Sequence, residues 1–140
     1  MKKELEKIFL DVRKNFIWTA DGSHELHYDG KSITLNDHWG LMQPDARGTL
    51  RGDCEDFALY CSRRLKDELN IHKSRRHLTY CKTESGEGHM ILCVREADSD
   101  QEYAFDNRQR RLRTLRALKR AGYTDFARPE GPINGPWLAL

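Results

Sequence analysis

The sequence predicts an α+β fold in which a cysteine-bearing helix packs on a small antiparallel sheet. Apolar residues recur at helical spacing from Cys54 onwards, which indicates an amphipathic helix. Three later segments, at 78–82, 89–95 and 102–106, are rich in apolar, β-branched or aromatic residues and are separated by polar loops. An antiparallel meander is the simplest way to connect them. A chain of 140 residues can bury one core, so we expect a single domain, 1–140.

Composition and charge limit the classes of protein to consider. Charged residues make up 33% of the chain and hydrophobic residues 38%, which is polar for a globular protein but sufficient for a core. No apolar run approaches the length of a membrane span, and charges occupy the place of a signal peptide's apolar stretch, so we expect a cytoplasmic protein without membrane association. The cysteines at 54, 61, 81 and 93 form no C-x-x-C pair, so we expect them reduced and bound to no zinc.

The segments before the cysteine begin with a helix and a hairpin. Apolar side chains recur at helical spacing over residues 5–16, with Lys and Glu between them. Short strand-like runs at 26–28 and 33–35 flank the turn dipeptide Asp29-Gly30. Such a dipeptide between two short runs predicts a β-hairpin.

A loop before the cysteine and a helix and tail after the sheet complete the predicted elements. Residues 36–52 are predicted as a loop, and loops that lead into a helix often carry binding residues, so His38 and Trp39 could line a cleft. A tryptophan is more often a core anchor. Leucines on one side of residues 111–121 predict a helix. The tail, 131–140, is expected to be extended, with an apolar end that packs back on the domain or meets a partner.

The stretch Gly52-Asp53-Cys54-Glu55-Asp56 places a thiol in the predicted first turn of a helix. Asp53 is a favoured N-cap residue, and the acids after the cysteine favour the positive end of the helix dipole. The unpaired N–H groups of that turn would stabilise a thiolate, which makes Cys54 a candidate nucleophile. The alternative is a buried cysteine behind an ordinary helix cap.

A cysteine nucleophile needs a base and a group that orients the base. Among the six histidines, His89 begins the most apolar strand-like segment. If the last two strand-like segments pair antiparallel through a loop with an even number of residues, His89 and Asp106 share a face of the sheet, and with the four-residue loop 96–99 they lie directly opposite. An odd loop would place Asn107 beside His89 instead. Asp106 could also simply cap a turn.

These motifs, taken in order, resemble those of the bacterial transglutaminase-like cysteine peptidases, whose best-known members are periplasmic proteases that cleave a large adhesin from the cell surface. The resemblance spans roughly residues 37–108 and is most specific around the cysteine. The matching stretches are G-D-C-E-D-F-A at 52–58, L-T-Y at 78–80, G-H-M-I-L at 88–92 and F-D-N at 105–107.

The resemblance implies a papain-like fold and a catalytic triad. It assigns Cys54 as the nucleophile, His89 as the general base and then acid, and Asp106 as the orienting group. We therefore expect a thiol hydrolase, a cysteine peptidase that cleaves a peptide or amide bond of a protein or peptide substrate through a thioester, acting as a monomer. The alternatives are a transglutaminase-like acyl transferase, an amidase, and a non-catalytic binding module.

The acids beside the cysteine oppose a thiolate through their charge. Bound calcium would remove this conflict, and the resemblance implies calcium held by the acids that flank the cysteine, here Asp53 and Glu55. The alternative is capping by solvated carboxylates, with no cofactor required. The backbone N–H of Cys54 is the expected first donor to an oxyanion, and Trp39 is a candidate second donor.

A basic strip between positions 108 and 120 is the feature on which a binding module would depend. Few aromatic residues interleave with its cations, and the whole-chain net charge of +2 means that the strip is offset elsewhere, so we expect no nucleic-acid partner. The alternative is the solvated face of a helix. The strip consists of Arg108, Arg110, Arg111, Arg113, Arg116, Lys119 and Arg120.

Overall fold

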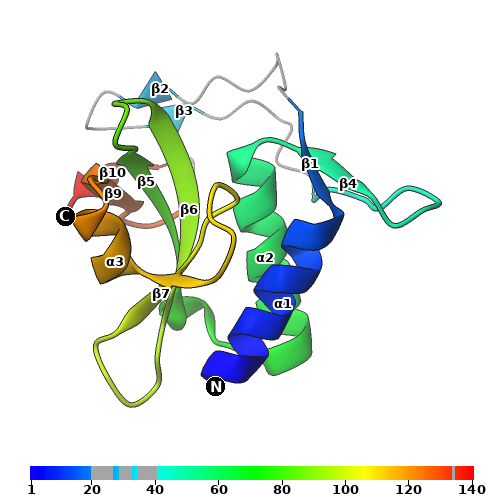
Figure 1. The fold of residues 1–140 in the computed structure, drawn as a ribbon. Coiled ribbons are helices and arrows are strands. Elements are labelled where there is room, and N and C mark those ends of the chain that lie inside the picture. Colours follow the sequence, from blue (N-terminus) through cyan, green and yellow to red (C-terminus); the bar gives the residue numbers. More distant parts are fainter. Residues whose placement is uncertain (20–26, 29–32, 35–40, 134) are drawn as a thin grey trace.

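The computed structural model describes residues 1–19, 27–28, 33–34, 41–133 and 135–140. In this part of the chain, helices α1 (Lys2–Asn15) and α2 (Cys54–Leu69) cover one face of an antiparallel sheet, and the short helix α3 (Leu115–Arg120) covers the other (Figure 1). The predicted α+β class, with a cysteine-bearing helix packed on an antiparallel sheet, is confirmed. No described helix is long and apolar enough to cross a membrane.

Within the described residues, the main sheet has six strands, and each is antiparallel to its neighbours. Along the chain they are β5 (Arg76–Lys82), β6 (Gly88–Arg95), β7 (Glu102–Phe105), β8 (Arg113–Thr114), β9 (Thr124–Pro129) and β10 (Trp137–Ala139). Their order across the sheet is β10-β9-β5-β6-β7-β8. The predicted meander is therefore confirmed as β5-β6-β7. A short 3₁₀ helix, Lys73–Arg75, leads into it.

Side chains of the central strand β6 alternate between two cores. Its even-numbered residues from 90 to 94 pack with α1 and α2, whereas Ile91 and Cys93 pack with the leucines of α3, Leu115 and Leu118. Successive residues of a strand point to opposite faces, so a strand covered on both sides must be apolar throughout. This explains why residues 89–95 form the most apolar segment of the sequence.

Two short ladders are separate from the main sheet. Strand β2 (His27–Tyr28) pairs antiparallel with β3 (Ile33–Thr34), as predicted for the hairpin, while the turn between them lies outside the described residues. Strand β1 (Phe16–Trp18) pairs in parallel with β4 (Leu50–Gly52). The predicted loop over 36–52 is wrong for these last three residues, because β1 supplies a strand partner that the local sequence does not reveal.

The predicted helix over 111–121 is wrong at its amino-terminal end. The hydroxyl of Thr114 accepts a hydrogen bond from the N–H of Ala117 at 3.1 Å, and this N-cap makes α3 begin at Leu115. Strand β8 consists of Arg113 and of the cap residue Thr114 itself. Leu112 consequently packs in the core beneath α1 and α2 and does not join the α3 leucines.

The tail, 131–140, is extended and packs back on the domain, which is one of the two predicted alternatives. Its strand β10 pairs with β9 at the edge of the sheet. Trp137 is completely buried, and its indole Nε1–H donates to the carbonyl of Ile133 at 2.9 Å. This hydrogen bond satisfies the polar atom that a buried tryptophan carries.

Candidate active site

Cys54 is the first residue of α2, and the helix begins there because Asp53 caps it. Oδ1 of Asp53 accepts from the N–H groups of Glu55 at 3.0 Å and Asp56 at 3.1 Å. In return, Oδ2 of Asp56 accepts from the N–H of Asp53 at 2.9 Å. This capping box satisfies amide donors of the first turn and contributes on the order of 1 kcal/mol. The predicted N-cap is confirmed.

Two glycines of the sequence motifs lie close to atoms of other residues. A Cβ on Gly52 would lie 2.6 Å from Cβ of Asp56 and 2.8 Å from the sulfur of Met42. A Cβ on Gly88 would lie 2.8 Å from the hydroxyl of Tyr80. The absence of a side chain at Gly52 lets the helix cap form, because the Asp56 Cβ cannot move away, whereas the tyrosine hydroxyl near Gly88 is the far end of a side chain that can turn.

The Cys54 thiol is partly buried and packs against the core between α2 and β6, with the backbone N–H of Met90 directed at its sulfur. Burial raises the pKa of this thiol to about 12, the charges of Asp53, Glu55 and Asp106 act in the same direction, and the Met90 N–H opposes them. Cys54 is therefore a protonated thiol at neutral pH.

The expectation that the helix N-terminus stabilises a Cys54 thiolate is wrong for this structure. The amide donors of Glu55 and Asp56 are already bound by the Asp53 carboxylate, so they do not face the sulfur. The other three cysteines are fully buried and free of disulfide bonds. Formation of a nucleophile at Cys54 therefore depends on a base.

His89 and Asp106 form a buried pair. Nε2 of His89 lies 2.6 Å from Oδ1 of Asp106, and the two side chains are 6% and 0% exposed. Because Nε2 faces the carboxylate, Nδ1 is the ring nitrogen left to exchange a proton with another group. The backbone N–H of Met90, the next residue along β6, is close enough to the Cys54 sulfur to lower the pKa of the thiol. The structure thus brings the three predicted residues together at one end of the sheet.

The pairing of β6 with β7 is shifted by two residues from the predicted register. The hairpin loop comprises residues 96–101 and not 96–99, and a backbone hydrogen bond of 2.9 Å joins its first and last residues. Continued beyond β7, this register places Asp106 beside Ile91, so the prediction that it lies directly opposite His89 is wrong. The loop length is even in both cases, and the prediction of a shared face is therefore correct.

Three donors hold the buried Asp106 carboxylate. Oδ1 accepts from His89 and from the N–H of Arg108 at 2.9 Å, and Oδ2 accepts from the hydroxyl of Tyr123 at 2.7 Å. Burial raises the pKa of Asp106, but the hydrogen bonds outweigh it and hold the pKa below its usual value, so the group is ionised at neutral pH. Asn107, the alternative orienting residue, has an Oδ1 that is buried without a hydrogen-bond partner among the described residues.

Tyr123 and Arg108 are the neighbours of the pair that the sequence analysis did not find. Tyr123 follows α3 after Gly122, whose φ is +104°, so the sequence marks a helix end there. That signal places the tyrosine in the chain but does not indicate its contact with Asp106, 17 residues away. In the sequence, Arg108 stands out only as a member of the basic strip.

The predicted calcium ligands, Asp53 and Glu55, lie together in the capping turn. Asp53 uses Oδ1 for the cap, and Glu55 is 9% exposed. Calcium takes six to eight oxygen ligands. Among the described residues, no group of three or more His, Cys, Asp or Glu side chains could hold a metal ion. These two acids could supply part of a calcium site but do not complete one.

The two residues considered for the cleft, His38 and Trp39, lie outside the described residues. The predicted role of Trp39 as a second oxyanion donor therefore stays a prediction. The backbone N–H of Cys54, the predicted first donor, occupies the first position of α2, where an amide has no partner within the helix.

The basic strip does not form one helical face. Its members are spread over the turn after β7, strand β8 and helix α3. Arg108 forms two hydrogen bonds with Glu84, at 2.6 and 3.0 Å, and is therefore neutralised locally. The arrangement does not provide the continuous basic surface that phosphate binding would use.

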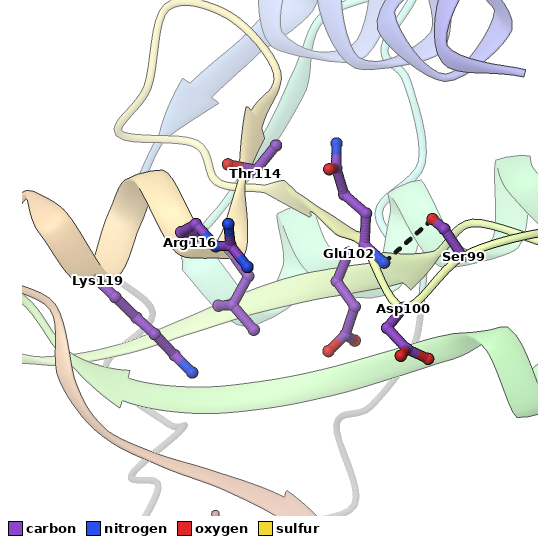
Figure 2. A pocket seen from close by; sticks show the side chains of 8 residues that line it. Ser99, Asp100, Glu102, Thr114, Arg116 and Lys119 are labelled. Carbon is purple, nitrogen blue, oxygen red and sulfur yellow. Dashed lines mark hydrogen bonds between the residues drawn. The ribbon is translucent and has the colours of Figure 1, made fainter.

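A cavity of about 450 Å³ lies between α3 and the loop before β7, at a place that includes none of the three predicted catalytic residues. Figure 2 shows Arg116 and Lys119 on one side of it and Asp100 and Glu102 on the other. Acids thus oppose the cations of the strip here, and the cavity gives no support to a site for a polyanion.

A helix-terminal cysteine beside a hydrogen-bonded histidine and aspartate on an antiparallel sheet defines the class of papain-like thiol hydrolases. The sequence profile of the family described as bacterial transglutaminase-like cysteine proteinase matches residues 24–140, and the chain belongs to this family. It is therefore a cysteine peptidase, and the resemblance found in the sequence is confirmed. The cytoplasmic location stays a prediction.

The fold is similar to that of Legionella pneumophila LapG in three solved structures. The calcium-bound form has a TM-score of 0.67 and 22% identity, over 98% of this chain and 68% of that chain. A second LapG structure has a TM-score of 0.66 and 21% identity, over 98% of this chain and 68% of that chain. The EGTA-treated form has a TM-score of 0.67 and 22% identity, over 99% of this chain and 67% of that chain. No curated protein matches the chain significantly.

Proposed function

We propose that this cysteine peptidase cleaves a peptide bond through a thioester on Cys54, with His89 and Asp106 completing the triad. The observation that carries the proposal is the placement of the sulfur against the Met90 N–H, next to a histidine whose Nε2 is held by Asp106. The substrate class is a protein or peptide, and we propose that the enzyme acts as a monomer.

The proposed reaction begins with proton transfer from Sγ of Cys54 to Nδ1 of His89. The sulfur attacks the carbonyl carbon, and the amine leaves with the proton from His89 when the C–N bond breaks. Water then attacks the thioester, giving a proton to His89, and the C–S bond breaks to release a carboxylic acid and the thiol. Asp106 stabilises the imidazolium in both halves, and the Cys54 N–H is placed to donate to the oxyanion.

A peptide library provides the test, because it samples many sequences and so reveals the cleavage site together with the activity. The wild-type protein and Cys54→Ala are incubated with the library in H₂¹⁸O, and new termini are identified by mass spectrometry. Peptide hydrolysis predicts new carboxyl termini that carry ¹⁸O with wild type only. An added alkylamine incorporated at the new carboxyl group would instead show acyl transfer, and no new product with either protein would contradict both reactions.

An exposed aromatic side chain lies at the edge of the site. Trp18 is 58% exposed, and the β1–β4 ladder pairs it with Gly52, two residues before Cys54. Phe16 on the same face of β1 packs on Phe57 of α2, with ring centroids 5.0 Å apart. The face therefore continues along β1 from the α2 contact to Trp18. We propose that Trp18 contacts an apolar side chain of the substrate close to the scissile bond.

We also propose that calcium binds at Asp53 and Glu55. Their carboxylates are hard oxygen ligands two positions apart in one turn, and LapG, to which the fold is similar, has a calcium-bound form. Bound calcium would supply positive charge beside the three acids of the turn. The described residues supply only part of its ligand set, and the reaction above includes no step at the ion.

A further inference from the structure

The hydroxyl of Tyr123 lies at the centre of a hydrogen-bonded group behind the His89–Asp106 pair. The Tyr123 side chain is 3% exposed. Its oxygen lies 2.7 Å from Oδ2 of Asp106, 2.8 Å from Nη1 of Arg108 and 3.2 Å from Nε2 of Gln109. All three contacts belong to the turn that follows β7. Tyr123 therefore contacts the Asp106 carboxylate on the oxygen that His89 does not use.

The direction of these hydrogen bonds follows from the donors available. A phenol has one proton to donate and two lone pairs to accept with. The guanidinium of Arg108 and the amide nitrogen of Gln109 can only donate, so they use the lone pairs, and the phenol proton has only Asp106 left as its acceptor. Burial and the neighbouring Asp106 carboxylate raise the pKa of Tyr123, so the hydroxyl keeps this proton throughout the working pH range.

The phenol is itself held in place by a second layer. Arg108 lies over the Tyr123 ring, with its guanidinium carbon 5.6 Å from the ring centroid, and Glu84 binds both of its terminal nitrogens. Helix α1 holds the same turn through a hydrogen bond from Nε of Arg13 to the carbonyl of Gln109. Groups from α1 and from the β5–β6 turn thus hold the β7–β8 connection, whose residues contact the hydroxyl.

We propose that Tyr123 is a positioning residue of the triad: its hydroxyl fixes the Asp106 carboxylate so that Oδ1 faces Nε2 of His89. This inference rests on the proposed function, because it concerns the orientation of the proposed base. Without the hydroxyl, Oδ2 has no other donor among the described contacts, and only the two donors to Oδ1 hold the carboxylate against rotation about its last bond. A turned carboxylate would release the histidine ring from the orientation that presents Nδ1 to the thiol.

A purely structural role of Tyr123 would come from its ring, which packs with Phe126, Leu118 and Cys81 in the core beneath α3. The change Tyr123→Phe keeps this ring and removes only the hydroxyl. Tyr103→Phe is the matched control, because Tyr103 is also buried in the sheet, and among the described residues its hydroxyl accepts a hydrogen bond from Gln101 at 3.2 Å and none from the triad. Both variants should fold, and circular dichroism checks this.

The first readout does not depend on activity. The pKa of Asp106 is measured by NMR from the titration of its side-chain carboxyl ¹³C. Tyr123→Phe should raise this pKa, because the variant loses a hydrogen bond that favours the ionised form. The other groups that face Asp106 stay in place: His89 on β6, Cys81 on β5, Cys54 on α2 and Arg108 in the following turn.

The second readout is the turnover of peptide. Tyr123→Phe should lower kcat about ten- to hundredfold with little change in KM, and the acidic limb of the rate should move to higher pH together with the pKa of Asp106. Tyr103→Phe should change neither. An unchanged carboxyl titration in Tyr123→Phe would overturn the proposal. A shifted titration in a protein that cleaves no peptide would leave the positioning role intact and contradict the proposed function.

Discussion

Replacing Gly52 by alanine tests whether the residue before the cap must lack a side chain. The new Cβ would lie 2.6 Å from Cβ and 2.7 Å from Oδ2 of Asp56, and 2.8 Å from the sulfur of Met42. The Cβ of Asp56 is bonded directly to the backbone and cannot move by a change of rotamer, so the first turn of α2 must shift. The shift would break the hydrogen bond from Asp53 N–H to Asp56, which is half of the capping box.

The free energy of unfolding that Gly52→Ala should lose has two contributions. Loss of the cap contributes about 1 kcal/mol. Overpacking at a contact of this kind contributes about 1–3 kcal/mol. The sum, roughly 2–4 kcal/mol, should lower the melting temperature by roughly 6–15 °C for a domain of this size. Because Cys54 is the next residue but one, peptidase activity at 25 °C should fall at least about tenfold even though the variant is folded.

The control is Gly131→Ala, where an added Cβ meets no atom within 4 Å. Melting temperature is measured by calorimetry, and activity is measured on a peptide found in the library experiment. Gly131→Ala should melt within about 2 °C of wild type. If Gly52→Ala behaved like Gly131→Ala in both assays, the close approach would not constrain the helix start, and the explanation of the G-D-C motif would be refuted.

Three further changes test other parts of the site. Asp106→Asn should lower kcat about ten- to hundredfold, through loss of a charge-assisted hydrogen bond to the imidazolium. Folding lowers the pKa of Asp106, so ionisation of this group stabilises the fold at a pH above its unfolded pKa of 3.8, and the stabilisation is lost as the pH falls through the folded pKa. The melting temperature of Asp106→Asn should therefore depend less on acid pH than that of wild type. Trp18→Ala should lower kcat/KM roughly tenfold for substrates with an apolar residue near the cleaved bond and leave others unchanged, and equal losses on all substrates would contradict a specificity role. Millimolar calcium should raise the melting temperature of wild type but not of Glu55→Gln, and calorimetry without a binding signal in wild type would exclude a site at this turn.

The elements that local patterns determine could be predicted from the sequence. The helical period after Cys54 and the N-cap preference of Asp53 fixed the start of α2, because both are properties of one short segment. Side chains alternate between the two faces along a strand, and together with an even loop length this predicted that His89 and Asp106 share one face of the sheet. The exact register did not follow, because it depends on how the 96–101 loop folds.

Contacts between distant segments escaped the sequence analysis for the same reason. Strand β4 forms only because β1 offers an edge to it, and α3 begins late because the hydroxyl of Thr114 caps it. The contact of Tyr123 with Asp106 requires that the turn after α3 meet the turn after β7, which no periodicity encodes. The raised pKa of Cys54 depends on tertiary burial and on a cap that uses the helix amides, so the position of the cysteine at a helix N-terminus suggested the wrong direction of the pKa shift.

The rate of alkylation of Cys54 tests the central claim that His89 generates the nucleophile. Iodoacetamide is added at pH 7, and the modified site is identified by mass spectrometry in wild type and in His89→Ala. Selectivity for Cys54 alone would prove little, because Cys61, Cys81 and Cys93 are fully buried. A thiol with a pKa of about 12 needs the imidazole to accept its proton, so Cys54 should react at least about tenfold more slowly in His89→Ala than in wild type. Equal rates in the two proteins would contradict the claim.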